Sequence, residues 1–273
     1  MNKFSILMSI YYKENPSYFN QCMESIWDNQ SLKANEIILV LDGKLTEELY
    51  SIINFWEDKL QGILKVIPLK ENLGLGDALN IGLSQAKNEL VARMDTDDIA
   101  SPNRFEIQIN QMIINNYDMC GSWVSEFEKN EKSITSYRKV PEKHDFILKY
   151  AKKRNPFNHP SIMYKKSVVE KSGGYIKMLW FEDYYLWVRV LMSGYTTYNI
   201  QKPLVHMRAG YSQLERRRGI TYAIEELKFL YKLKSIGFIS FVQFIQNALT
   251  RFIIRLLPKN LLKNIYKILR GRK

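Results

Sequence analysis

The stretch LVARMDTDD, at residues 90–98, joins a short apolar segment directly to three carboxylates. Leu90 to Met94 has the length and composition of a buried β-strand. The three acidic side chains that follow repel one another, so a compensating charge is expected at this strand end. Carboxylate oxygens suit Mg²⁺ or Mn²⁺. A solvated acidic turn, or a helix start capped by Asp98 or Ser101, would need no ion, and the motif alone leaves both interpretations open.

Apolar segments and helical periods alternate on the N-terminal side of this motif. Strands are predicted at 4–12, 36–41, 62–68 and 90–94, and helices at 18–29, 46–60 and 76–86. This alternation predicts an α/β protein with a mostly parallel central sheet flanked by helices. Ligands of such sheets bind beyond the carboxyl ends of the strands. The polar residues that follow each strand are therefore candidate site residues.

The chain beyond the motif is less regular. A helix is predicted at 102–116, strands at 119–127 and 133–140, a helix at 181–193 and a further strand after Pro203. Cys22 and Cys120 lie in no CxxC or metal-binding spacing. Both are therefore expected to be buried apolar side chains rather than ligands.

The net charge is unevenly distributed along the chain. A formal charge of +12, from 40 basic and 28 acidic residues, at first suggests a nucleic-acid-binding protein. No acidic residue follows Glu226, however, and residues 227–273 contain 11 of the basic side chains. The rest, with 29 basic and 28 acidic residues, is close to neutral. A near-neutral body with a basic tail is indicated, and no nucleic-acid partner is expected.

The basic tail has the pattern of amphipathic helices. One apolar stripe, interrupted at Pro258, consists of Phe241, Phe244, Ile245, Ala248, Leu249, Phe252, Ile253 and Leu256, and a second, at 261–269, lies beside Lys259, Lys263 and Lys267. An apolar face beside a cationic one is typical of helices at an anionic membrane surface. A helix that packs on the body and keeps its lysines in water would show the same pattern.

No segment reaches the roughly 20 apolar residues of a membrane span, and no signal-peptide cleavage site is present. A cytoplasmic protein is therefore expected.

Two further polar segments follow predicted strands. Asp42-Gly43 could bind a base or ribose, or form a simple turn. Asn72-Leu73-Gly74-Leu75-Gly76 opens a helix after the third strand. Leu79 stands where the third glycine of a dinucleotide-binding motif would fall, so the chain lacks that motif.

Taken together, these segments resemble family 2 glycosyltransferases of the GT-A fold, in particular those of bacterial O-antigen, capsule and exopolysaccharide synthesis. The resemblance rests on the order and spacing of residues 5–12, 36–43, 72–82 and 93–98, with Pro102, Arg104, Phe105 and Gln108. The segments 158–161, 173–175 and 182–189 resemble the acceptor half of that family. The resemblance implies a GT-A domain at 1–220, divided into a nucleotide-sugar-binding half (1–100) and an acceptor half (101–220). A basic, amphipathic, membrane-associating helical tail would occupy 221–273.

The resemblance also implies roles for individual residues. The nucleotide sugar would contact Tyr11, Asp42, Asn72, Gly74, Arg93 and Asp95. Asp97 would be the principal ligand of Mg²⁺ or Mn²⁺, with Asp95 assisting. His206 would be a third ligand, although the segment His206-Met207-Arg208 departs from the family pattern at this point. Asp183 would be the general base, and Glu182 would position that base or the acceptor; otherwise the two form an acidic pair at a helix N-terminus.

The function implied by the resemblance is an inverting sugar transfer. The donor would be a nucleotide sugar, UDP-linked, and the acceptor a saccharide on a polyprenyl diphosphate, reached by a peripheral protein at the inner face of the cell membrane. Two alternatives remain. A nucleotidyltransferase would place a glycine-rich loop with a catalytic Lys or Arg after the first strand, where this chain has YYKENP at 11–16. A non-catalytic membrane or nucleic-acid adaptor would leave the acidic residues unexplained.

Overall fold

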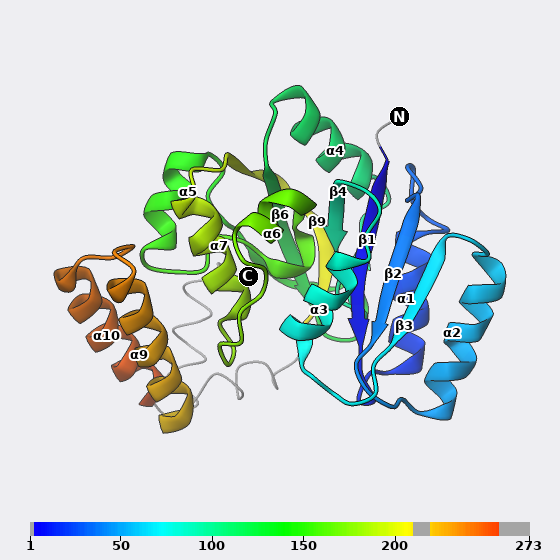
Figure 1. The fold of residues 1–273 in the computed structure, drawn as a ribbon, viewed down its shortest axis with the longest axis horizontal. Helices are drawn as coiled ribbons and strands as arrows, with labels where there is room; N and C mark the ends of the chain where they lie inside the picture. Colours follow the sequence, from blue (N-terminus) through cyan, green and yellow to red (C-terminus); the bar gives the residue numbers. More distant parts are fainter. Residues whose placement is uncertain (1–2, 210–218, 257–273) are drawn as a thin grey trace.

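The computed structural model describes residues 3–209 and 219–256, and a central sheet carries helices on both of its faces (Figure 1). The strands are β1 (Phe4–Ile10), β2 (Glu36–Leu41), β3 (Leu64–Pro68), β4 (Leu90–Arg93), β5 (Ile99–Ala100), β6 (Met119–Phe127), β7 (Ile134–Arg138), β8 (Met163–Lys165) and β9 (Thr197–Arg208). The helices are α1 (Pro16–Ile26), α2 (Glu47–Lys59), α3 (Leu75–Ser84), α4 (Arg104–Ile114), α5 (His144–Ala151), α6 (Lys166–Lys171), α7 (Glu182–Met192), α9 (Gly219–Ser235) and α10 (Phe241–Leu256), with a 3₁₀ turn, η1 (His159–Ser161). Every strand and helix predicted before residue 100 is confirmed.

The sheet is parallel in its first half and mixed in its second. Its strand order is β3-β2-β1-β4-β8-β6-β9-β5, and β7 pairs with β6 outside this path. The strands β3, β2, β1 and β4 run parallel to one another, as the strand–helix alternation predicts. Beyond β4, the pairs β4–β8, β8–β6, β6–β7 and β5–β9 are antiparallel, and only β6–β9 is parallel. The alternation ends after residue 100, and the parallel order ends with it.

Both faces of the parallel half are buried. Successive side chains of a strand point to opposite faces, so Ile6 and Met8 of β1 join one apolar cluster with α1, α2 and α4. Leu7 joins the other cluster, with α3, α6 and α7. Helix α3 approaches the sheet closely, because a Cβ at Gly82 would lie 2.5 Å from Cδ1 of Leu7 and 2.8 Å from Cγ2 of Val40. This packing fixes the loops at the carboxyl ends of β1, β2 and β4.

Capping residues define the first two helices. The side chain of Asn15 accepts hydrogen bonds from the amides of Ser17 and Tyr18, with Pro16 at the first position of α1. Thr46 accepts from the amide of Leu49 and begins α2. Both side chains satisfy amides that a helix start leaves without partners.

Two local expectations from the sequence are wrong. Neither Asp98 nor Ser101 caps α4, whose N-cap Asn103 makes no capping hydrogen bond with its side chain; the Asp98 carboxylate instead accepts from the amide of Arg208. Pro203 does not precede a strand but lies inside β9, beside a register shift between β6 and β9. A shift of this kind tolerates proline, which cannot donate a ladder hydrogen bond.

The two C-terminal helices of the described chain lie side by side at the end of the molecule opposite α2 (Figure 1). Tyr222, Phe229 and Leu233 of α9 are buried in the same apolar cluster as α3 and α7, and Phe244 and Ala248 of α10 pack against that cluster. The predicted helix at 241–256 is therefore present and packs on the body. The predicted second stripe, at 261–269, lies outside the described residues. Within the described residues, no helix is both long and apolar enough to cross a membrane.

Candidate active site

The candidate site lies where the parallel strands end. Ile10 of β1 is in register with Leu41 of β2, and both strands run parallel, so Tyr11 and Asp42 leave the sheet at the same edge. Strand β4 pairs with β1 in the same direction, and the motif Asp95-Thr96-Asp97-Asp98 follows it. The sequence therefore correctly predicts the edge at which these residues gather.

A fourth carboxylate, that of Glu14, joins the acidic motif. Its Oε2 accepts a hydrogen bond of 2.6 Å from the hydroxyl of Thr96. Burial, and then the charges of Asp95 and Glu14, raise the pKa of Asp97 to about 7. Burial and the charges of Asp97 and Asp95 likewise raise the pKa of Asp98 well above its usual value. The motif thus concentrates negative charge, which favours a bound cation.

Arg93 supplies a positive charge next to the motif. Its side chain is 1 % exposed, and Nη2 forms an ion pair with Asp95. The carbonyl of Arg93 accepts a hydrogen bond of 2.7 Å from the fully buried Arg104. Arg104 also donates to Gln108 at 3.0 Å, and Gln108 donates to the carbonyls of Cys120 and Ser161. A buried polar network therefore holds the end of β4, and Arg93 lies beneath the motif rather than at its surface.

Asp42 organises the loop before α3. Its Oδ1 accepts from the amide of Leu73 at 2.7 Å, and its Oδ2 accepts from the amide of Gly74 at 3.1 Å. The side chain of Asn72 donates to the carbonyl of Asp42 at 3.1 Å. Gly43, at φ +88°, lets the loop approach, because a Cβ there would lie 2.9 Å from the nitrogen of Asn72. The loop after β2 and the loop before α3 therefore meet, and the Asp42 carboxylate binds the backbone of residues 73–74.

The acidic pair predicted to serve the acceptor lies at the N-terminus of α7. Glu182 and Asp183 are the first two residues of that helix. Burial raises the pKa of Glu182, and the charges of Asp183 and Asp77 add to the effect. Asp183 accepts hydrogen bonds on both oxygens, from the amide of Tyr184 at 2.7 Å and from Nδ2 of Asn155 at 2.8 Å. A carboxylate held in this way has a fixed direction.

Tyr175 joins the two halves of the site. Asn80 of α3 forms two hydrogen bonds of 2.7 Å with the backbone of Tyr175. The Tyr175 hydroxyl is hydrogen-bonded at 2.9 Å to Nε2 of His159. Burial raises the pKa of Tyr175 well above its usual value, with Arg93 lowering it and Asp183 raising it in part. The charge of Arg93, next to the acidic motif, and that of Asp183 on α7 therefore both act on the Tyr175 hydroxyl.

His206 lies in a different environment from the one expected of a metal ligand. Its Nδ1 is 2.6 Å from the hydroxyl of Ser125 and its Nε2 is 3.2 Å from that of Ser101. Burial lowers the pKa of His206. Because both ring nitrogens are already hydrogen-bonded, this arrangement does not support His206 as a third metal ligand.

Asp95 and Asp97 suit a cation whose remaining ligands come from the substrate of the protein. Among the residues that the structure describes, no three His, Cys, Asp or Glu side chains form a group able to hold a metal ion by themselves. Mg²⁺ is commonly held by one or two carboxylates together with substrate phosphates. Burial and the neighbouring carboxylates, which together raise the pKa of Asp97, fit such a partial site.

Three site residues were not predicted to act here. Glu14 reaches the motif from the loop after β1, and its place after a strand end was the signal that could have revealed it. Asn155 holds Asp183 from a loop with no recognisable pattern. Arg208 donates from its backbone to Asp98 and from Nε to the carbonyl of Asp97, at 2.8 and 3.1 Å. It thus contacts the motif at the carboxylate of Asp98 and at the backbone of Asp97.

The family of the chain follows from comparison with known proteins. A family model described as glycosyl transferase family 2 matches residues 5–173. The chain belongs to glycosyltransferase family 2. The match spans β1 to the loop after α6, so it includes the acidic motif, Asp42 and the loop before α3. Membership decides among the three functions left open by the sequence: the protein is a glycosyltransferase.

Individual relatives of this glycosyltransferase are similar over nearly its whole length. It is 42 % identical over 97 % of its length, and 95 % of the relative's, to the UDP-Gal:alpha-D-GlcNAc-diphosphoundecaprenol beta-1,3-galactosyltransferase of Escherichia coli. It is 38 % identical over 97 % of its length, and 98 % of the relative's, to an amylovoran biosynthesis glycosyltransferase of Erwinia amylovora. The structure of S. aureus TarS 1-349 with UDP-GlcNAc matches with a TM-score of 0.67 at 17 % identity, covering 93 % of this chain and 72 % of that one. The last likeness confirms the GT-A fold.

Proposed function

We propose that this glycosyltransferase moves one sugar, with inversion, from a UDP-sugar to a saccharide carried on a polyprenyl diphosphate, in the synthesis of a bacterial surface polysaccharide. The observation that carries the proposal is the 42 % identity, over 97 % of the chain, to an enzyme named for UDP-Gal and a GlcNAc-diphosphoundecaprenol acceptor. Its similarity to an amylovoran biosynthesis enzyme supports the same class of product.

Asp183 is the proposed general base. An inverting transfer needs one group to take the proton of the acceptor hydroxyl while its oxygen attacks the anomeric carbon. Asp183 is the candidate because its carboxylate is fixed by the amide of Tyr184 and by Asn155. Glu182, whose pKa is raised, orients the acceptor beside it.

The donor side is assigned to the loops at the strand ends. Tyr11, 40 % exposed, would stack on the nucleotide base. Asn72 and Gly74 would line the nucleotide pocket, on a loop that Asp42 holds in shape. Arg93 acts by fixing Asp95. Mg²⁺ or Mn²⁺ bound by Asp97 and Asp95 would neutralise charge on the departing diphosphate.

The C-terminal region is the proposed contact with the membrane. Phe241, Val242 and Leu249 of α10 are 64 %, 62 % and 60 % exposed, and exposed apolar side chains of this size are typical of binding surfaces. Beyond α10, residues 257–273 carry Lys and Arg but no acidic side chain. We therefore assign the enzyme to the inner face of the cell membrane, where its acceptor would be anchored.

The test is a transfer assay with the purified full-length protein. UDP-galactose, UDP-glucose, UDP-GlcNAc and GDP-mannose are each offered with a synthetic GlcNAc-diphospho-lipid and Mn²⁺. We expect one UDP-sugar to yield UDP and an acceptor extended by one sugar residue. NMR of the product should show that the anomeric configuration is inverted. Preferential use of GDP-mannose, or retention of configuration, would contradict the proposal. Asp183→Asn, which keeps shape but removes the base, should reduce turnover by at least about a hundredfold.

A further inference from the structure

The loop before η1 holds the carboxylate of Asp183. Asn155 donates from Nδ2 to Oδ2 of Asp183 at 2.8 Å. The Oδ1 of Asn155 accepts from the amide of Phe157 at 3.3 Å, which sets the amide with its NH₂ group toward Asp183. Pro156 follows and restricts the backbone of Asn155 to extended conformations. Backbone and side chain of Asn155 are thus both constrained to one geometry.

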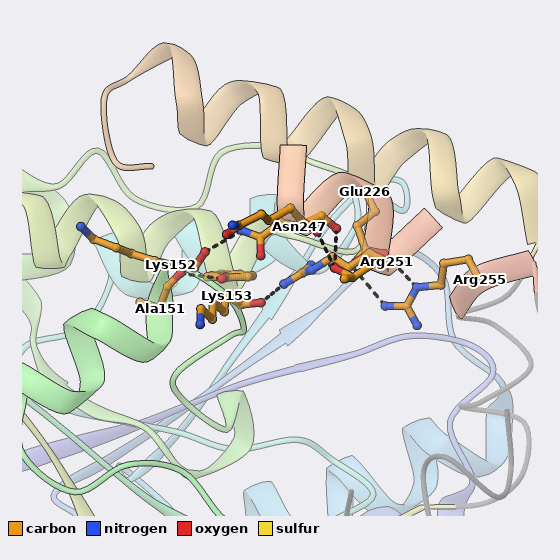
Figure 2. Close-up of polar contacts among 10 residues, drawn as sticks. Ala151, Lys152, Lys153, Glu226, Asn247, Arg251 and Arg255 are labelled. Carbon is orange, nitrogen blue, oxygen red and sulfur yellow. Dashed lines mark hydrogen bonds and ion pairs between the residues drawn. The ribbon is translucent and has the colours of Figure 1, made fainter. Parts of the chain in front are cut away.

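Helix α10 holds the same loop three residues upstream. The side chain of Asn247 donates to the carbonyl of Lys152 at 2.8 Å, and the guanidinium of Arg251 donates to the carbonyl of Lys153. Figure 2 shows both contacts crossing from α10 to the end of α5. Carbonyls past the end of a helix have no partner within it. Here α10 supplies those partners, and it thereby fixes the path of the chain into Asn155.

An ion cluster holds α10 in place. Glu226 of α9 is 2 % exposed and pairs with Arg251 at 2.5 Å and with Arg255 at 2.8 Å (Figure 2). Two of the cations that the sequence assigns to a membrane-facing tail are therefore internal, with side chains 16 % and 12 % exposed. One of them, Arg251, makes contact with Glu226 and with the loop at once.

We propose that Asn155 is the positioning residue of the general base Asp183, and that Asn247 and Arg251 of α10 act on the base through it. The inference deepens the proposed function and rests on its assignment of Asp183. A donor to the ionised carboxylate stabilises that form and fixes its direction toward the acceptor. The helix that exposes Phe241 and Leu249 to the proposed membrane surface is then the helix that sets the base.

The groups that share this environment keep their charges in the tests below. Glu182 lies next to Asp183 on α7, and its pKa responds to Asp183, to Asp77 of α3 and to Lys177. The Tyr175 hydroxyl also responds to Asp183. None of these residues is altered, so a change in the pH profile reports on the contact with Asn155.

The first experiment removes the donor itself, using full-length protein and the transfer assay above. Asn155→Ala should lower kcat about tenfold, leave KM for the UDP-sugar unchanged, and move the acid limb of the kcat/KM profile up by about one pH unit, because the ionised base loses a charge-assisted hydrogen bond. Asn155→Asp keeps the size but sets a second carboxylate against Asp183, so the acid limb should move further up. An unchanged acid limb in both variants would overturn the inference.

The second experiment tests whether α10 acts through Asn155. Asn247→Ala leaves the Glu226 ion cluster intact and should shift the acid limb in the same direction, by less than Asn155→Ala. In the Asn155→Ala background the same change should alter kcat by less than about twofold, since a residue that acts through another has nothing left to act on. Thr250→Ala is the control: its exposed hydroxyl bonds only carbonyls of its own helix, those of Gln246 and Asn247, and should leave the profile unchanged.

The outcomes separate the inference from the proposed function. If Asp183→Asn is inactive while Asn155→Ala and Asn247→Ala keep the wild-type pH profile, the base stands and the positioning inference fails. Fully additive effects of Asn155→Ala and Asn247→Ala would show that α10 contributes stability only. If Asp183→Asn turns over normally, the base assignment fails, and the inference fails with it.

Discussion

The side-chain amide of Asn80 pairs with the backbone of Tyr175 through two hydrogen bonds of 2.7 Å. Asn80 belongs to α3, which follows the loop that Asp42 holds, and Tyr175 precedes α7, which carries Glu182 and Asp183. The close approach is possible because Gly174, at φ +61°, has no Cβ; one there would lie 2.6 Å from Oδ1 of Asn80. One amide therefore joins the two halves of the site.

Asn80→Leu should destabilise the protein. It leaves the N–H and C=O of Tyr175 without partners in a buried region, at a cost of about 2 kcal/mol, so Tm should fall by about 4–8 °C for a chain of this size. Differential scanning fluorimetry of the purified protein measures it. Ser84→Ala, at the end of the same helix where the hydroxyl bonds only the carbonyl of Ile81, is the matched control. Equal Tm values for Asn80→Leu and Ser84→Ala would refute the assigned role.

Asp97→Asn should abolish transfer and also remove stabilisation by metal. Mn²⁺ that binds the folded state alone raises Tm by mass action, and the wild-type protein should show this shift after EDTA treatment and re-addition of the ion. The variant loses the negative charge at the centre of the acidic motif, so we expect little or no shift and transfer reduced by at least about a hundredfold. A full Mn²⁺-dependent Tm shift in Asp97→Asn would mean that the ion binds elsewhere.

Glu226→Gln should destabilise the packing of α9 and α10. Breaking a buried ion cluster costs about 3 kcal/mol, since Arg251 and Arg255 are left near a neutral amide. The neighbouring Glu225→Gln removes an exposed pair with Lys228 and should cost less than about 1 kcal/mol. Urea unfolding of both variants measures the difference. Similar midpoints for the two variants would contradict this account of the cluster.

The cost of Glu226→Gln should depend on pH. Burial raises the pKa of Glu226, but its contacts with Arg255 and Arg251 outweigh that effect and leave the pKa below its usual value. A carboxyl whose pKa is lower in the folded state stabilises the protein above its unfolded pKa, and this stabilisation is lost as pH falls through the folded value. The gap in stability between wild type and Glu226→Gln should therefore be constant from pH 7 to about 5 and shrink below. A gap that grows on acidification would reverse the sign that we assign.

Membrane binding should depend on the exposed apolar side chains of α10. Phe241→Ser with Leu249→Ser removes apolar surface that a bilayer would bury, at about 2 kcal/mol per side chain, and should weaken sedimentation with phosphatidylglycerol vesicles by more than tenfold. Removal of 257–273 should weaken it further by deleting cations. Truncation at 241 is a poor substitute, because Phe244 and Ala248 pack against the core. Unchanged sedimentation of both variants would place the membrane contact elsewhere.

Much of the structure of residues 3–100 could be predicted because its signals are local. A buried strand such as Glu36–Leu41 is a continuous apolar run, and a helix such as Glu47–Lys59 shows its period and its Thr46 cap within a few residues. Because the strands of such units run parallel, the residues that follow each strand lie at one edge of the sheet. Asp42 and the acidic motif were found for this reason.

The chain after residue 100 was harder to predict, because its arrangement depends on contacts between distant residues. The antiparallel approach of β8 to β4 and the shifted register of β9 follow no pattern within the strands themselves. His206 illustrates the consequence. Its residue type suits a metal ligand, but packing places it between the hydroxyls of Ser101 and Ser125.

The sequence by itself determined the parallel half of the sheet, the position of the carboxylates at its edge and the helical nature of residues 241–256, since periodicity and strand order are properties of neighbouring residues. Only the tertiary structure decided which atoms those groups contact. Arg251 and Arg255 belong to the basic tail in the sequence, but in the folded protein they form ion pairs with Glu226. Asn155 likewise becomes the hydrogen-bond partner of Asp183. A buried charge or amide must find a partner, and the identity of that partner depends on which chain segments packing brings together.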